Sequence, residues 1–319
     1  MRPDPDSPPT LPAFVRLSVV HDTEYRYAFP VEMAHHVACL RPLSDAGQRL
    51  RQFEMSVSPQ PLQHSVRTDS FGNSLGYFSL SAPHSSLQVV ARSEVDVFAR
   101  YEGLDLSASA TVAEVQGQLA YRAHADFQPA SEFAYASAYV PLHQELRDYA
   151  QQSLRPGRPL AEAVHELMQR VHHDFKYAPL TTDISTPILQ VFRERQGVCQ
   201  DFAHLMIGCL RACGLSARYV SGYLLTHPPK GQPRLIGADA SHAWLSVWCP
   251  GLGLPGADPW LDLDPTNNCI PALDHIRVAH GRDFGDVTPL RGVIRGGGQH
   301  TLVVRVTTRP VEECQPQVK

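Results

Sequence analysis

The sequence predicts an α+β protein with an N-terminal β-sandwich-like domain, followed by a region of helices and then strands. Three observations predict this class. Residues 14–100 contain short runs of alternating apolar and polar residues, separated by turn signals that are typical of an all-β domain. From residue 141 onward, apolar residues recur at helical spacing. After residue 214 the strand-like alternation returns, so helices and strands share the second region.

The same patterns divide the chain into segments. At 319 residues the chain exceeds a typical single core, so we expect two domains. Residues 1–13 are proline-rich, lack the features of a signal peptide and are expected to form a disordered lead. The N-terminal β domain spans 14–100, and 101–140 form a linker that either wraps the core or bridges the domains. Residues 141–319 form the second domain, with a C-terminal strand in TLVVRVTT.

Composition excludes several classes of partner. The net charge of −4 leaves no basic excess for a nucleic acid or another polyanion. No apolar run approaches the length needed to span a membrane. Seven cysteines, an odd number without a C-x-x-C pair, fit reduced intracellular thiols better than a disulfide framework. We therefore expect a cytoplasmic protein.

A cysteine at the start of a predicted helix is the first candidate functional residue. In QGVCQDFAHLMIGCLRACG, residues 196–214, Gly197 provides a turn and Gly214 a left-handed C-cap, and the segment between them reads as an amphipathic helix. Cys199 would face unpaired N–H groups and the positive end of the helix dipole, which favour the reactive thiolate. Free cysteines are also often buried apolar groups, so this position alone does not establish reactivity.

Two short strands supply a histidine and a carboxylate. ASHAWLSVW and WLDLDPT flank a Gly/Pro-rich connection, and a hairpin symmetric about residue 253 sets His242 opposite Asp264. Opposed residues share a face, with Cβ atoms about 5 Å apart. Such a carboxylate can hold one ring nitrogen while the other addresses a thiol. The structural alternatives are a buried histidine bonded to a carbonyl and a turn made by Asp264 before Pro265.

GVCQDFAHL, ASHAW and LDLDPTN, in this order, resemble the transglutaminase-like cysteine superfamily, specifically its bacterial members. The resemblance implies a papain-like/transglutaminase-like core of helices packed on an antiparallel sheet. It implies that Cys199 is the nucleophile, that His242 is the general base and acid, and that Asp264 orients the imidazole. The first hundred residues resemble the N-terminal domain that often precedes this bacterial core.

A Cys–His–Asp set suits acyl transfer on protein or peptide amides. The thiolate attacks the carbonyl, the Cys199 N–H and one further donor meet the oxyanion, and His242 protonates the leaving amine to leave a thioester. Attack by water makes the protein a cysteine peptidase or amidase, and attack by a primary amine makes it a protein-glutamine gamma-glutamyltransferase. We place hydrolysis first, because bacterial members resemble proteases at least as often as cross-linking enzymes. A non-catalytic binding module that retains the fold is the third alternative.

Two aromatic residues are candidates for supporting the oxyanion or the substrate site. Tyr177 lies in a segment that passes beside the catalytic cysteine in the family, although a packed aromatic is the simpler interpretation. Trp244 shares the predicted face of His242, with Trp248 and Trp260 nearby. Aromatic walls that exclude water would favour amine transfer, but such residues also fill cores.

No cofactor is expected. The GGG turn lacks the lysine and the helix of a phosphate-binding loop, and no cluster of carboxylates suggests calcium. His21, His35 and His36 lack the spacing of metal ligands, so no metal is expected. The expected partner is a protein or peptide substrate, with neither nucleic acid nor membrane, and no oligomeric state is favoured.

Overall fold

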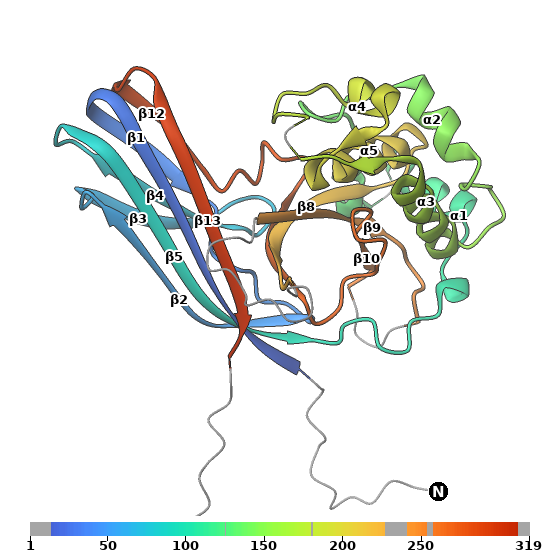
Figure 1. Cartoon of the computed structure of the whole chain (residues 1–319). Coiled ribbons are helices and arrows are strands. Elements are labelled where there is room, and N and C mark those ends of the chain that lie inside the picture. The colour runs from blue at the N-terminus through green and yellow to red at the C-terminus, as the bar shows by residue number, and fades with distance from the viewer. Residues whose placement is uncertain (1–13, 125, 180, 227–240, 254–257, 312–319) are drawn as a thin grey trace, which may run out of the picture.

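The computed structural model describes residues 14–124, 126–179, 181–226, 241–253 and 258–311. Two bodies lie side by side: a long curled sheet and a core in which helices cover a second sheet (Figure 1). The predicted disordered lead, 1–13, lies outside the described residues. In the described ranges every cysteine is a free thiol, and no helix has the length and apolar character needed to cross a membrane.

The first body is an antiparallel sheet of seven strands with the order β2-β5-β1-β4-β3, and β12 and β13 also pair with β1. Residues of β1, β4 and β5 enclose an apolar cluster separate from that of the core. This strand-rich domain confirms the predicted fold class. Its strands are β1 (Phe14–Ala38), β2 (Gln48–Ser58), β3 (Gln63–Thr68), β4 (Ser74–Leu80), β5 (His84–Phe98), β12 (Leu290–Gly296) and β13 (His300–Pro310).

Strand β1 organises this sheet. It is 25 residues long, and buried and less buried residues alternate along its first half, as expected for a strand with one face toward a core. Its first half pairs with β5 and β13, and its second half pairs with β4 and β12. The expectation that the C-terminal strand belongs to the second domain is therefore wrong. The alternation in TLVVRVTT predicts a strand but carries no information about which distant edge it joins.

The second body has an antiparallel sheet with the order β10-β9-β8-β11. Helices cover this sheet, which confirms the predicted core (Figure 1). Its strands are β8 (Ala217–Leu224), β9 (Ser241–Trp248), β10 (Trp260–Leu263) and β11 (His275–Gly281), and a short parallel pair joins β6 (Lys176–Tyr177) to β7 (Gln196–Gly197). The helices are α1 (Val112–Leu119), α2 (Gln144–Gln151), α3 (Leu160–Asp174), α4 (Ile188–Glu194) and α5 (Cys199–Ala212), with 3-10 turns at Leu106–Ala108 and Pro129–Ala134.

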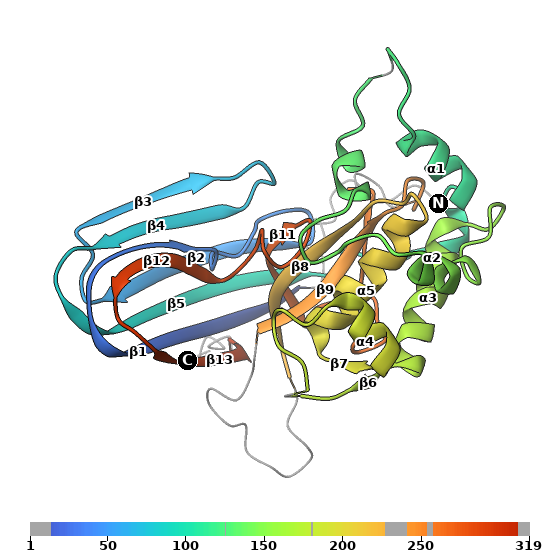
Figure 2. The same cartoon turned by 90° about the horizontal axis from the view of Figure 1, so that it is seen from above.

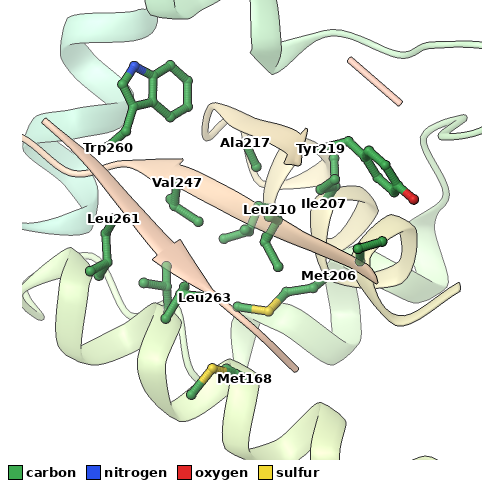
Figure 3. Close-up of a cluster of buried hydrophobic side chains, with 14 of the residues drawn as sticks. Met168, Met206, Ile207, Leu210, Ala217, Tyr219, Val247, Trp260, Leu261 and Leu263 are labelled. Carbon is green, nitrogen blue, oxygen red and sulfur yellow. The ribbon is translucent and has the colours of Figure 1, made fainter. Parts of the chain in front are cut away.

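Helix α5 is the centre of the core and is buried on all sides, not amphipathic as predicted. It lies between the sheet and helices α2, α3 and α4, and every residue from 201 to 211 is buried. Met206 and Leu210 point toward Val247, Leu261 and Leu263 of the sheet (Figure 3). A helix that packs on every face needs little polar surface, which explains its apolar composition.

Buried polar residues of α5 are paired, and the helix ends as predicted. The ring of His204 accepts the N–H of Phe284 at 3.1 Å. Arg211 donates to the carbonyl of Ala217 at 2.8 Å and to three other partners in the described residues. Gly214 has a φ of +73°, which confirms the left-handed position after the helix.

The segment 101–140 both wraps the core and contacts the first domain. Its helix α1 buries Val115 against the core. The hydroxyl of Tyr101 donates to the Trp260 carbonyl at 3.0 Å. The ring of Phe133 lies 5.5 Å from Phe71 of the first domain and 5.4 Å from Trp260 of the core.

The two bodies meet along β11, the edge strand of the core sheet (Figure 2). The buried Gln48 side chain donates to the Arg277 carbonyl at 2.7 Å and accepts the Arg277 N–H at 2.8 Å. The guanidinium of Arg277 also contacts Asp45 at 2.6 Å. Asn73 bonds in the same two-sided way to the backbone of His280. The first domain therefore continues the hydrogen bonding of the core sheet through side chains.

Candidate active site

The three residues predicted to act together lie together. Cys199 is the first residue of α5, His242 lies on β9, and Asp264 follows β10. The Nε2 atom of His242 lies 2.7 Å from Oδ2 of Asp264. The Cys199 thiol lies beside the same imidazole, close enough to help raise its pKa. Because Asp264 occupies Nε2, Nδ1 is the ring nitrogen that remains for the sulfur.

The strand register differs from the prediction by two residues. Trp260 pairs with Trp248, and Leu263 pairs with Leu245, so Asp264 lies diagonal to His242 and not directly opposite it. Asp264 instead forms a bridge with Cys269. A shift of two residues keeps every side chain on its face of a sheet, whereas a shift of one would have separated the pair. His242 and Asp264 therefore remain in contact although the register differs from the prediction.

Asp264 is fully buried and accepts hydrogen bonds on both oxygens. Oδ1 accepts the backbone N–H groups of Thr266 and Asn267, at 2.9 and 3.1 Å. Oδ2 accepts the side-chain amide of Asn267 at 2.7 Å and lies 3.1 Å from Nε2 of His275. The turn considered as a structural alternative is therefore present, and it coexists with the contact to His242.

The charges of this cluster stabilise one another. Burial alone would raise the pKa of Asp264, but hydrogen bonds from His242 and His275 and their charges hold it well below its usual range. Burial opposes a charge on His242, but the hydrogen bonds to Asp264 and Cys199 prevail and raise the pKa of this imidazole well above its usual value. At neutral pH the arrangement favours a carboxylate facing an imidazolium.

Sequence reasoning missed His275 and Asn267. His275 is almost fully buried at the start of β11, and its Nδ1 atom lies 2.7 Å from Oδ1 of Asp274. Burial opposes its charge, but Asp264 and Asp274 together raise the pKa of His275. No spacing in the sequence links residue 275 to the triad, because the contact depends on which strand lies beside β8. Asn267 was identified only as a turn residue.

Within the described ranges, His242, Asp264 and His275 form a group whose ligand atoms lie close enough to hold a metal ion, all within 4.8 Å. Hydrogen bonding accounts for each contact in this group. Both ring nitrogens of His275 face carboxylates, an arrangement that keeps a proton on each nitrogen and leaves no lone pair for a metal. Ordinary donor–acceptor distances of 2.7 and 3.1 Å agree with this assignment.

Tyr177 lies beside the strand that leads to Cys199. It pairs with Gly197 in the parallel β6–β7 ladder, and its side chain is half exposed. Partial burial and the nearby Cys199 raise the pKa of Tyr177. Tyr177 is thus a surface residue close to the thiol, not a packed core aromatic.

Trp244 occupies a different place from the one expected. Its side chain has no exposed surface, and its ring lies 5.9 Å from that of His242 and 5.2 Å from that of His275. Trp244 therefore supports the imidazoles from inside the protein and cannot contact a substrate. Trp248 and Trp260 are also buried, so they do not form the aromatic wall that would favour amine transfer.

Gly197 is required for a reason other than turn geometry. A Cβ atom on this residue would lie 2.8 Å from both Cβ and Oδ2 of Asp201. Oδ2 of Asp201 accepts the Val198 N–H at 2.8 Å and the Thr182 hydroxyl at 2.7 Å. Asp201 thereby caps the N-terminus of α5. The N–H of Cys199, at the first helical position, has no hydrogen-bond acceptor within the helix.

A cysteine at a helix start, a histidine and an aspartate on an antiparallel sheet, and a preceding strand-rich domain define the class of this protein. Residues 17–96 match the bacterial transglutaminase-like N-terminal region, and residues 147–265 match the transglutaminase-like superfamily. The chain belongs to the bacterial transglutaminase-like cysteine superfamily.

Two mycobacterial relatives match more than nine-tenths of the chain. Uncharacterized protein Rv2569c of Mycobacterium tuberculosis is 40% identical over 305 residues, 93% of each chain. Uncharacterized protein ML0607 of Mycobacterium leprae is 32% identical, covering 92% of this chain and 98% of that one. A protein-glutamine gamma-glutamyltransferase of Pseudomonas aeruginosa is 33% identical over 138 residues, 41% of this chain and 20% of the relative. The crystal structure of a candidate cysteine protease from Cytophaga hutchinsonii has the same fold, with a TM-score of 0.70, 18% identity and coverage of 94% and 92%.

Proposed function

We propose that this protein is a thiol-dependent acyl-transfer enzyme that acts on protein or peptide amides, with hydrolysis as its principal reaction. One observation carries the proposal: Cys199, at the first position of a helix, lies beside an imidazole whose Nε2 atom lies 2.7 Å from a buried carboxylate. An imidazolium beside a cysteine stabilises the thiolate, which is the nucleophilic form.

The first half-reaction forms a thioester. The Cys199 sulfur bonds to the amide carbon, and the carbonyl electrons move to the oxygen, where the Cys199 N–H donates to the oxyanion. Tyr177, half exposed beside the thiol, is the proposed second donor. When the intermediate collapses, the C–N bond breaks and His242 transfers its Nδ1 proton to the leaving amine.

The second half-reaction regenerates the thiol. Water attacks the thioester carbon, gives a proton to His242, and displaces the Cys199 sulfur to release a carboxylic acid. Among the described residues, Trp244, Trp248 and Trp260 are buried, so these three side chains do not form an aromatic wall that would keep water from this step. That placement favours hydrolysis over transfer to an amine.

Transfer to a primary amine is the second candidate. The glutamyltransferase of Pseudomonas aeruginosa is 33% identical over 138 residues of this chain. In that reaction a glutamine side chain is the acyl donor, ammonia leaves, and an amine replaces water in the second half-reaction. A non-catalytic module that retains the fold is the third candidate.

A glutamine-containing peptide, offered with and without a primary amine, separates the candidates. Release of ammonia or cleavage of the peptide without amine incorporation, measured by mass spectrometry, supports hydrolysis. Amine incorporation supports the transferase. The Cys199→Ala variant is the control for both, and activity that persists in EDTA agrees with a metal-free mechanism. A wild-type protein whose Cys199 reacts with iodoacetamide no faster than Cys269, another partly exposed cysteine, would contradict catalysis.

A further inference from the structure

The edge strand of the core sheet contributes a second imidazole to the site. His275 opens β11, and its two ring nitrogens lie 3.1 Å from Oδ2 of Asp264 and 2.7 Å from Oδ1 of Asp274. The side chain of His275 is 2% exposed, whereas that of Asp274 is 44% exposed. A charged chain therefore runs from the protein surface at Asp274 to the buried carboxylate of the triad.

The contact has a specific geometric consequence. Two backbone N–H groups fix the position of Oδ1 of Asp264. The carboxylate could still rotate about Oδ1, so its orientation depends on the groups that donate hydrogen bonds to Oδ2. Those donors are Asn267, His242 and His275. Asn267 lies in the same turn as Asp264. Among the described residues, His275 is therefore the donor other than His242 that reaches Oδ2 from a separate strand.

The ring of His275 is itself held in place. Trp244 packs edge-on against it at 5.2 Å, and Asp274 accepts from its outer nitrogen. Two residues along β11, Arg277 is fastened to Asp45 and Gln48 of the first domain. The strand that carries His275 is thus fixed from both sides.

We propose that His275, anchored by Asp274, is a positioning residue of the active site: it fixes the Asp264 carboxylate and, through it, the orientation of His242 toward Cys199. This inference rests on the proposed function and adds a fourth and a fifth residue to its machinery. It also gives the first domain a role, because that domain fixes the strand on which His275 lies.

Site-resolved alkylation of the full-length protein by iodoacetamide tests the proposal without a known substrate. The variants are His275→Leu, which removes the donor, His275→Gln, which keeps a donor without charge, and Asp274→Asn at the exposed end of the chain. His280→Gln is the matched control, because it makes the same change on the same strand away from Asp264. Circular dichroism and the melting temperature verify that each variant is folded.

We expect alkylation of Cys199 at pH 7 to fall about tenfold in His275→Leu, the effect of losing one charge-assisted hydrogen bond. His275→Gln should recover part of this loss, Asp274→Asn should fall less than His275→Leu, and His280→Gln should match the wild type. A purely structural role would lower the melting temperature and leave the rate in the folded protein unchanged.

Three outcomes would overturn the proposal. The first is an alkylation rate equal to that of the wild type in both folded variants, His275→Leu and His275→Gln. If wild-type Cys199 is labelled fast in the same experiment, that result contradicts the inference but not the proposed function. If the His275 variants do not fold, an unchanged rate in Asp274→Asn decides against it. Slow labelling of Cys199 in the wild type would instead contradict the proposed function, and the inference with it.

Discussion

Cys199 and Cys209 share helix α5, yet their surroundings assign them different chemistry. Cys199 is partly exposed beside the His242 ring, whereas Cys209 is fully buried among apolar side chains. Burial raises the pKa of the Cys209 thiol far above its usual range, so this sulfur remains protonated and serves as packing. The same residue type therefore gives opposite predictions at the two positions.

Cys199→Ala should abolish turnover and leave the fold intact, because the sulfur is the proposed nucleophile and the site is partly exposed. Cys209→Ala should retain activity and lower the free energy of unfolding by about 1–2 kcal/mol, because it leaves a cavity in the core. Urea unfolding and an assay with the peptide probe measure both effects. Residual turnover in Cys199→Ala would contradict its assignment.

Two histidines, the buried His242 and the partly buried His280, should respond to pH in opposite directions. Despite the opposing effect of burial, Asp264 and Cys199 raise the pKa of His242 to about 10 in the folded protein, from an unfolded value of 6.5. Its stabilisation is complete below pH 6.5 and is lost as the pH rises toward 10. Burial and Arg218 lower the pKa of His280 to about 3, so its stabilisation is complete above pH 6.5 and is lost as the pH falls.

Urea unfolding of wild type, His242→Gln and His280→Gln between pH 5 and 9 measures these dependences. The stability difference between wild type and His242→Gln should shrink as the pH rises above 6.5. The difference for His280→Gln should shrink as the pH falls below 6.5. If the two stability differences changed with pH in the same direction, the ion pair between His242 and Asp264 would be contradicted.

The proximity of Cys199, His242 and Asp264 was predictable from sequence because each residue follows a local pattern: a helix start for Cys199, and strand alternation for His242 and Asp264. His275 was not predictable in this way. Its place beside Asp264 depends on β11 joining the edge of β8, a choice that no local alternation contains. Trp244 shows the same limit, because its predicted face was that of His242 but not its depth in the protein.

At the scale of elements, the contact between His242 and Asp264 required that both side chains lie on the same face of the sheet, not that the strands pair in the predicted register. The β9–β10 pairing is displaced by two residues from the predicted one, yet His242 and Asp264 remain on one face. Helix α5 shows the converse: its limits were predictable from Cys199 and Gly214, but its burial on every side was not. The residues that cover its second face come from α2 and α3, which are distant in the sequence, and from α4 just before it, and no local pattern shows how these helices pack.

Gly222 connects the elements behind the site. It pairs with His242 across β8 and β9, and a Cβ atom there would lie 2.1 Å from the Ile276 carbonyl and 2.5 Å from the Trp244 ring. Gly222→Ala should therefore lower the free energy of unfolding by about 1–3 kcal/mol and slow Cys199 alkylation, because Trp244 must move.

Gly157→Ala is the matched control, since no atom lies within 4 Å of a Cβ added there. It should leave both the urea midpoint and the alkylation rate near those of wild type. Equal behaviour of the two variants would show that Trp244 and Ile276 yield without cost, contrary to the close approach described here.

At the scale of the whole molecule, the first domain is bound to the edge of the core sheet. Gln48 satisfies both backbone groups of Arg277, and it is 1% exposed. The sequence predicted a strand-rich domain here, but it gave no sign of this contact, because a glutamine on a strand is ordinarily a surface residue.

Gln48→Ala leaves the buried N–H and C=O groups of Arg277 without these partners, and it should cost about 1–3 kcal/mol of stability. If the contact of Gln48 with Arg277 fixes the position of β11 and hence of His275, Cys199 alkylation should slow as well. Gln52→Ala, on the exposed surface of the same strand, should change neither quantity. An unaltered unfolding curve for Gln48→Ala would contradict the docking role of this side chain.

The pairing of β1 with β12 and β13 has a consequence for biosynthesis. Strand β1 is synthesised well before its partners β12 and β13, and the four strands of the core sheet lie between them in the sequence. The residues of the core sheet are therefore synthesised before the sheet of the first domain can acquire its last two strands. Excising residues 14–100 as a fragment would expose the very edge that those late strands cover, and such a fragment should aggregate.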